Sequence, residues 1–394
     1  MSIEGDLAAS LPADAVDATL VGRAWLPGDL SGPAVIAVRG GEIYDLTDRT
    51  PTMSALLERE DAVTLARTAP GRAIGRVDDL LRNSRGDQRD AREPFLLAPC
   101  DLQVIKASGV TFASSLIERL IEEQARGDPA RAETVRSQIV GIIGEDLRAI
   151  VPGSEAAMRL KRTLVEQRLW SQYLEVGIGP DAEIFTKSPV LSAIGTGGDI
   201  GLHPASTWNN PEPEIVLAVN SRGQAVGATL GNDVNLRDFE GRSALLLGKA
   251  KDNNASCAIG PFLRLFDDRC SMDHVREAEI TVSVSGPDEF TLDGHSSMRQ
   301  ISRDPLDLVA AAIGSTHQYP DGLMLFLGTM FAPIKDRDER GAGFTHKIGD
   351  VVTIATPKLG ALVNRVGRSD EVAPWTFGIG ALMSNLAKRG LLRG

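Results

Sequence analysis

The strongest constraint on the fold is a pair of carboxylates, Glu212 and Glu214, placed directly before an apolar run at residues 215–219. A strand alternates its side chains, so these two carboxylates lie on one face while Ile215 and Leu217 lie on the other. Two like charges on one face repel each other unless a positive group lies between them. A divalent cation is one such group, and hard cations such as Mg²⁺ prefer oxygen ligands. The motif therefore predicts a strand that begins at a metal-binding site.

The residues that follow predict a hairpin that supplies a third carboxylate. Residues 220–224 are typical of a tight turn, after which the chain returns as a second strand. A turn centred on residues 222–223 places Asp233 opposite Glu212, and a turn centred one residue later places it opposite Glu214. The register between these two would turn Asp233 to the other face, because a one-residue slip reverses every side chain. Two glutamates alone at the start of a strand are typical of a solvated strand edge. With Asp233 on the same face, the hairpin predicts a Mg²⁺ or Ca²⁺ site that leaves positions for water or substrate.

Several short motifs then occur in a fixed order. They are Glu-Pro-Glu at 212–214, Asn-Asp-Val-Asn-Leu-Arg at 232–237, Gly-Lys at 248–249 and Gly-Pro at 260–261. This ordered set resembles the fumarylacetoacetate hydrolase superfamily, and the resemblance covers about residues 181–394. It implies a mixed β-roll with a metal at one open end.

The resemblance also implies roles for individual residues. The three carboxylates Glu212, Glu214 and Asp233 are expected to hold Mg²⁺ or Mn²⁺, and Lys249 is expected in the substrate pocket. Thr329, together with the glycine before it, is expected to line the pocket and to help bind a substrate carboxylate.

Composition narrows the class of protein. The chain has 394 residues, enough for two domains, and its formal net charge of −11 argues against nucleic acid or an anionic membrane as a partner. Its three cysteines are odd in number and widely separated, which is typical of reduced thiols in the cytosol. The acidic N-terminus lacks the regions of a signal peptide, and no apolar run reaches the ~20 residues that span a bilayer. We expect a cytoplasmic enzyme, and the family resemblance implies a homodimer or homotetramer.

Periodicity divides the chain into three regions. Residues 1–100 carry short strand patterns and predict a small β-rich domain. Residues 101–178 predict three amphipathic helices, at 112–121, 135–143 and 158–170, which form either a lid over a pocket or a plain helical wall. Residues 179–394 predict strands with one helix at 305–315. Together with the resemblance, these patterns predict an α+β chain whose C-terminal β-roll is the catalytic domain.

The start of the helical region distinguishes two branches of the family. In the carbon–carbon hydrolases, a His followed three residues later by a Glu activates a water molecule. Here Glu118 occupies the Glu position but Ser115 occupies the His position, so the dyad is missing. Residues 104–112 and 344–350 instead resemble the branch that dehydrates 2-keto-3-deoxy-pentonates. The resemblance implies conversion of 2-keto-3-deoxy-D-xylonate, D-arabinonate or a stereoisomer to 2,5-dioxopentanoate, with acylpyruvate or fumarylacetoacetate-type hydrolysis as the alternative.

The chemistry of a dehydratase suits these residues. A 2-keto acid can chelate the metal, which stabilises the enolate formed when a proton leaves C3. Glu118 is our candidate for the base, and Lys249 for a fixed positive charge beside the enolate or the substrate carboxylate. The remaining predicted substrate contacts are Ser108, Thr111, Lys187, Ser188 and Thr329. A non-enzymatic alternative is a scaffold that binds metal for structure, which predicts that removal of the metal unfolds the chain.

Overall fold

The N-terminal region of the computed structural model alternates short strands with short helices. The model describes residues 10–392 apart from 127, 129–130, 133, 135–149, 167–169, 334 and 340–342. The elements of this region are β1 (Leu20–Leu26), β2 (Gly32–Arg39), β3 (Glu42–Asp45), α2 (Met53–Leu57), α3 (Ala62–Thr68), β4 (Arg72–Arg76), α4 (Val77–Asn83) and β5 (Phe95–Leu97). The turn between β2 and β3 uses Gly40 and Gly41, whose φ angles of 58° and 80° favour glycine.

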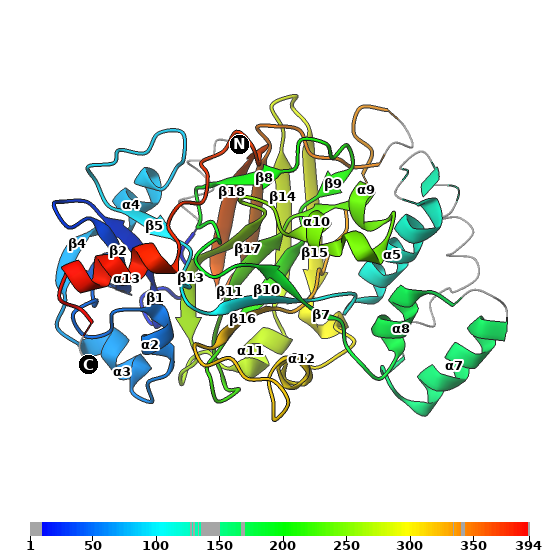
Figure 1. Ribbon diagram of the computed structural model, residues 1–394, viewed down its shortest axis with the longest axis horizontal. Coiled ribbons are helices and arrows are strands. Elements are labelled where there is room, and N and C mark those ends of the chain that lie inside the picture. Colours follow the sequence, from blue (N-terminus) through cyan, green and yellow to red (C-terminus); the bar gives the residue numbers. More distant parts are fainter. Residues whose placement is uncertain are drawn as a thin grey trace.

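The helical region begins with strand β6 (Val104–Ser108) and continues with α5 (Ala113–Ala125), α7 (Glu155–Glu166) and α8 (Gln172–Ile178). These helices lie together on one side of the molecule, at the right of Figure 1. Buried Leu116 and Leu120 of α5 pack in one cluster with Leu164 of α7 and Leu174 of α8. The first and third predicted helices are therefore confirmed, whereas the one expected at 135–143 lies outside the described residues.

The C-terminal region is mostly strands joined by short helices. Its first half comprises β7 (Ile184–Ser188), β8 (Asp199–Leu202), β9 (Asn209–Asn210), β10 (Pro213–Val219), β11 (Ala225–Asp233), β12 (Asn235–Leu236), α9 (Arg237–Glu240), η2 (Ala244–Leu246), α10 (Leu247–Lys251) and β13 (Cys257–Leu265). Its second half comprises α11 (Met272–Arg276), β14 (Glu279–Ser285), β15 (Thr291–Ser297), η3 (Met298–Gln300), α12 (Pro305–Ala312), β16 (Leu323–Phe326), β17 (Val351–Thr356), β18 (Gly360–Arg368) and α13 (Ile379–Lys388). The helix expected at 305–315 is α12, which begins at the capping residue Asp304.

Most of the described strands form two mixed sheets, and β9 pairs with β12 in a third sheet of two strands. The larger sheet has the order β4-β3-β2-β1-β13-β11-β10-β16-β6-β7, with β5 paired to β1, and the smaller has the order β15-β14-β17-β18-β8. Because β1 pairs with β13, the larger sheet continues from the N-terminal region into the C-terminal one. The C-terminal helix α13 lies against the N-terminal strands, where Asn385 donates to the carbonyl of Ser31 at 2.7 Å (Figure 1).

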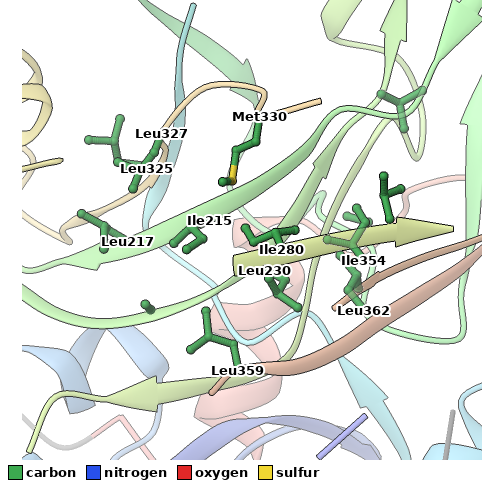
Figure 2. Packing of buried hydrophobic residues seen from close by; sticks show 14 of the residues in the cluster. Ile215, Leu217, Leu230, Ile280, Leu325, Leu327, Met330, Ile354, Leu359 and Leu362 are labelled. Atoms are coloured by element: carbon green, nitrogen blue, oxygen red, sulfur yellow. The ribbon is translucent and has the colours of Figure 1, made fainter. Parts of the chain in front are cut away.

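The main core lies between the two sheets. Figure 2 shows Ile215 and Leu230 of the central hairpin next to Ile280 of the smaller sheet, and Leu217 and Ile354 belong to the same buried cluster. The opposite face of β10, with Val216 and Ala218, packs into a second buried cluster. Burial on both faces explains why the strand after the two glutamates is an unbroken apolar run rather than an alternating one. The carboxylates at its start are thus fixed by a rigid, fully buried element.

Among the described residues, no helix is both long enough and apolar enough to cross a bilayer.

Candidate metal centre and active site

Three carboxylates converge at one end of the central hairpin. Strands β10 and β11 pair with Pro213 opposite Asn232, and the amide of Asp233 donates to the carbonyl of Glu212 at 3.0 Å. This is the first of the two registers considered from the sequence. One carboxylate oxygen from each of Glu212, Glu214 and Asp233 lies within 4.8 Å of the other two, and all three residues are buried. The predicted metal ligands are therefore brought together.

Two buried lysines flank these carboxylates. The Nζ of Lys187, on β7, lies 2.8 Å from one oxygen of Asp233. The Nζ of Lys251, at the end of α10, lies 2.5 Å from Glu212 and 3.1 Å from the other oxygen of Asp233. Because both lysines are almost wholly buried, their charges act at short range in a poorly screened environment.

Among the three clustered carboxyls, Glu214 and Asp233 differ in their affinity for a proton. Burial, followed by the nearby charges of Asp233 and Glu212, raises the pKa of Glu214 well above its ordinary value. Burial also opposes ionisation of Asp233, but Lys187 and Lys251 outweigh it and lower its pKa. Glu214 accepts a hydrogen bond from the amide of Gly328 at 2.7 Å. Glu214 therefore takes up a proton more readily than Asp233 does.

A second group of charges adjoins the first through Arg119 of α5. Its guanidinium contacts Glu212, lies 2.6 Å from Glu122 of the same helix, and lies 2.9 Å from Glu240 of α9. Arg237, at the start of α9, lies 3.1 Å from Glu122 and continues the network. Through Arg119, the helices α5 and α9 are thus connected to Glu212 at the start of β10.

Glu183 is a further acidic group in this site that the sequence did not reveal. It directly precedes β7, and its carboxylate lies against the backbone of Gly109, where an added Cβ would come within 1.9 Å of Oε2. Burial, followed by the charge of Glu240, raises the pKa of Glu183 from 4.5 to about 7. Arg119 and Lys251 are close enough to oppose that shift. A carboxyl group with this pKa can donate or accept a proton near neutral pH.

The donors fit a hard divalent cation. Glu122, Glu183, Glu212, Glu214, Asp233 and Glu240 provide six carboxylates, and Arg119, Lys187, Arg237 and Lys251 provide four basic groups. When all of these carboxyls are ionised, the described side chains leave an excess of negative charge that a bound cation offsets. The three clustered carboxylates are the oxygen ligands that Mg²⁺ and Mn²⁺ prefer.

The structure does not bring Lys249 into this site. Lys249 is exposed, and its Nζ lies 5.0 Å from the centre of the Phe239 ring. Residues two apart on a helix point to opposite sides, so Lys249 and Lys251 of α10 cannot both face the carboxylates. The lysine in the site is Lys251, two positions after the one selected from the sequence.

Of the other predicted residues, Thr111 and Thr329 lie beside the Glu214 end of the central strands, whereas Ser188 lies at the opposite end of the β6–β7 pair. Thr111 donates its hydroxyl to the carbonyl of Leu327 at 2.6 Å, and Thr329 donates to the carbonyl of Phe331 at 3.1 Å. Gly328 has a φ of 99°, and a Cβ there would come within 1.9 Å of the Thr111 hydroxyl. Ser108 and Ser188 are buried at the ends of β6 and β7. Glu118 is buried on α5, directly before Arg119.

Comparison with known proteins identifies relatives of this chain. The family model described as "Fumarylacetoacetate (FAA) hydrolase C-terminal" matches residues 165–367. The "Probable 2-keto-3-deoxyxylonate dehydratase" of Haloferax volcanii is 25% identical over 334 residues, which is 84% of this chain and 94% of that protein. The "2-dehydro-3-deoxy-D-arabinonate dehydratase" of Saccharolobus solfataricus is 26% identical over 190 residues, 48% of this chain and 60% of that protein.

Solved structures confirm the predicted fold. An apo form of 2-keto-3-deoxy-D-arabinonate dehydratase superposes with a TM-score of 0.62 at 20% identity, covering 89% of this chain and 99% of that one. A second structure, described as that dehydratase complexed with magnesium and 2,5-dioxopentanoate, gives a TM-score of 0.62 at 19% identity with the same coverage. The α+β chain with a mixed β-roll is therefore confirmed.

Proposed function

Since the chain belongs to the fumarylacetoacetate hydrolase family, we propose that it is a metal-dependent dehydratase of sugar acids. Its substrate would be a 2-keto-3-deoxy-pentonate of the D-xylonate or D-arabinonate type, and its product 2,5-dioxopentanoate. The observation that carries the proposal is the buried set of Glu212, Glu214 and Asp233, flanked by Lys187 and Lys251. The names of the two curated relatives and of the magnesium complex support this choice of substrate.

The carboxylates Glu212, Glu214 and Asp233 would hold Mg²⁺ or Mn²⁺. Such an ion supplies a Lewis acid for the keto oxygen of the substrate. Lys251, and not Lys249, provides the fixed positive charge, because its buried ammonium group can stabilise negative charge that develops on the substrate. Lys187 holds Asp233 in its ionised form.

Two carboxyl groups divide the proton transfers in this proposal. Glu118 on α5 removes the proton from C3, and Glu183 donates a proton to the C4 hydroxyl as it leaves. A raised pKa keeps Glu183 protonated up to neutral pH, as a general acid requires. Loss of one water leaves a double bond between C3 and C4. A proton then leaves C5 and another is returned to C3, which gives an enol between C4 and C5, and this enol tautomerises to the aldehyde. Substrate contacts are assigned to Ser108, Thr111, Lys187, Ser188 and Thr329.

Ser115 argues against hydrolysis of carbon–carbon bonds. It is buried, and its hydroxyl donates to the carbonyl of Phe112 at 2.8 Å, within its own helix turn. A serine in that state cannot take the place of the histidine that activates water with a glutamate.

We further propose a cytoplasmic location and a homodimer or homotetramer. The three cysteines, Cys100, Cys257 and Cys270, are buried free thiols, which suits a reducing compartment.

The test is turnover of 2-keto-3-deoxy-pentonate by protein stripped with EDTA, with and without added Mg²⁺. Aldehyde is followed through a coupled semialdehyde dehydrogenase. We expect formation of aldehyde that requires Mg²⁺ and is lost in Glu214→Gln. Absence of aldehyde in a folded protein that binds Mg²⁺ would refute the proposed reaction.

A further inference from the structure

Arg119 connects the helical region to the metal-ligand candidate Glu212. Its side chain is 8% exposed and contacts carboxylates from three elements, namely Glu122 of α5, Glu240 of α9 and Glu212 at the start of β10. Glu212 is held from the other side by Lys251 of α10, through its second oxygen. The basic groups that contact this carboxylate therefore come from both parts of the molecule, and Arg119 is the contribution of α5.

Apart from these charges, α5 is attached mainly by apolar packing. Leu116 and Leu120 face α7 and α8, which belong to the same helical region. Ile121 and Ala125 pack with Trp208, which precedes β9. The polar attachment of α5 near the metal-ligand candidates thus consists of the Arg119 contacts and of the pair between Glu122 and Arg237, and only Arg119 contacts Glu212.

A divalent cation and Arg119 compete for the same negative charge. A cation held by Glu212 withdraws that charge from the guanidinium and places a like charge beside it. The ion pair between Arg119 and Glu212 therefore weakens when the cation binds. The two equilibria are linked. If binding of the cation weakens the docking of α5 by some factor, then docking of α5 lowers the affinity for the cation by the same factor.

We propose that Arg119 is a positioning residue that couples the docking of α5 to the occupancy of the metal site. The contact between Arg119 and Glu212 stabilises the docked position of α5 and lowers the affinity for the cation. Binding of the cation therefore weakens the docking of α5. An anionic 2-keto acid bound at the cation adds negative charge and restores the attraction for Arg119. This inference rests on the metal site of the proposed function, though not on the identity of the reaction.

The test measures the affinity for Mn²⁺ by titration calorimetry and hydrogen–deuterium exchange in α5, with oxalate as an inert anionic chelator. The main variant is the double substitution Arg119→Met with Glu240→Gln, which removes the contact with Glu212 and preserves the net charge of the cluster. Leu120→Ala is the matched control, because it disturbs the packing of α5 and leaves Arg119 in place. Glu214→Gln tests the metal site itself.

In the wild type, we expect Mn²⁺ to speed exchange in α5 by about 5-fold or more, and oxalate to reverse the effect. The double variant should bind Mn²⁺ tighter by a similar factor, with exchange in α5 that no longer responds to the ion. Leu120→Ala should speed exchange, should raise the affinity for Mn²⁺ by no more than the same factor, and should leave exchange in α5 responsive to the ion, because Arg119 is still in place. Equal or weaker Mn²⁺ binding by the double variant, or an unresponsive α5 in the wild type, would overturn the coupling.

The metal site has its own outcome in the same experiment. Failure of the wild type to bind Mn²⁺, or binding by Glu214→Gln with wild-type affinity, would refute the metal site and with it the proposed function. If the wild type binds Mn²⁺ tightly, Glu214→Gln abolishes that binding, and the double variant keeps the wild-type affinity for Mn²⁺, the coupling alone would be refuted.

Discussion

Replacement of Glu183 by Gln should stabilise the protein at alkaline pH while it removes activity. Burial raises the pKa of this carboxyl from 4.5 to about 7, so the folded state keeps the proton over a range in which the unfolded chain has lost it. Its contribution to stability is therefore lost as the pH rises through the folded-state value. A tenfold change in proton affinity corresponds to about 1.4 kcal/mol. The raised pKa of Glu183 therefore lowers the free energy of unfolding by about 3 kcal/mol above pH 7 and by about 1 kcal/mol at pH 5, relative to a side chain that does not ionise.

Urea unfolding at pH 5 and pH 8.5 measures this cost. The free energy of unfolding of Glu183→Gln, relative to the wild type, should rise by about 2 kcal/mol between the two pH values, because Gln does not ionise. Turnover should fall by about 10²- to 10⁴-fold with loss of the general acid. Glu60→Gln, at an exposed position, is the control and should show neither effect. A stability difference that does not depend on pH would refute the burial argument, and wild-type turnover would refute the acid role.

Further substitutions test the remaining parts of the site. Lys251→Met should lower kcat/KM by about 10²-fold or more, whereas the exposed Lys249→Met should leave it within about 2-fold, as steady-state kinetics of the two variants will show. Gly109→Ala should displace the Glu183 carboxylate and lower kcat/KM by about 10²-fold, while Gly248→Ala, where an added Cβ meets no atom within 4 Å, should have little effect. In the wild type, kcat/KM should fall above about pH 7 as Glu183 loses its proton, and a pH profile without that descending limb would contradict its role. Treatment with EDTA should abolish turnover and leave the circular dichroism spectrum unchanged, because apolar packing on both faces of β10 holds the hairpin and the two lysines offset part of the carboxylate charge; unfolding would favour a structural metal.

The central hairpin could be predicted because its pattern is local. The alternation at Glu212 and Glu214 and the turn at 220–224 limited Asp233 to two registers on the correct face. The sequence could not choose between the registers, because a bulge between Ala218 and Val219 shifts the pairing near the turn. The register that forms pairs Asp233 with Glu212.

The sequence is less informative where the site depends on helix orientation or on contacts between distant segments. Lys249 and Lys251 differ only in the side of a short helix to which they point, and the bounds of α10 are not evident from its residues. Glu183 gains its raised pKa from burial against Gly109 and from the distant Glu240, so its local sequence carries no signal. Likewise, strand β13 pairs the N-terminal region with the C-terminal sheet, and a long-range pairing of that kind leaves no periodic pattern.

The division of the chain at residues 100 and 178 remains a prediction. The continuous sheet across β1 and β13 favours cooperative unfolding of the regions before and after the helical segment.

The most direct test of the account is a competition experiment read by mass spectrometry. The wild type, loaded with Mg²⁺, is given 2-keto-3-deoxy-pentonate and an acylpyruvate in the same tube, with Glu214→Gln in parallel. The account predicts that the sugar acid loses one water to give 2,5-dioxopentanoate, that the acylpyruvate persists, and that the variant forms neither product. Cleavage of the acylpyruvate with the sugar acid unchanged would contradict it.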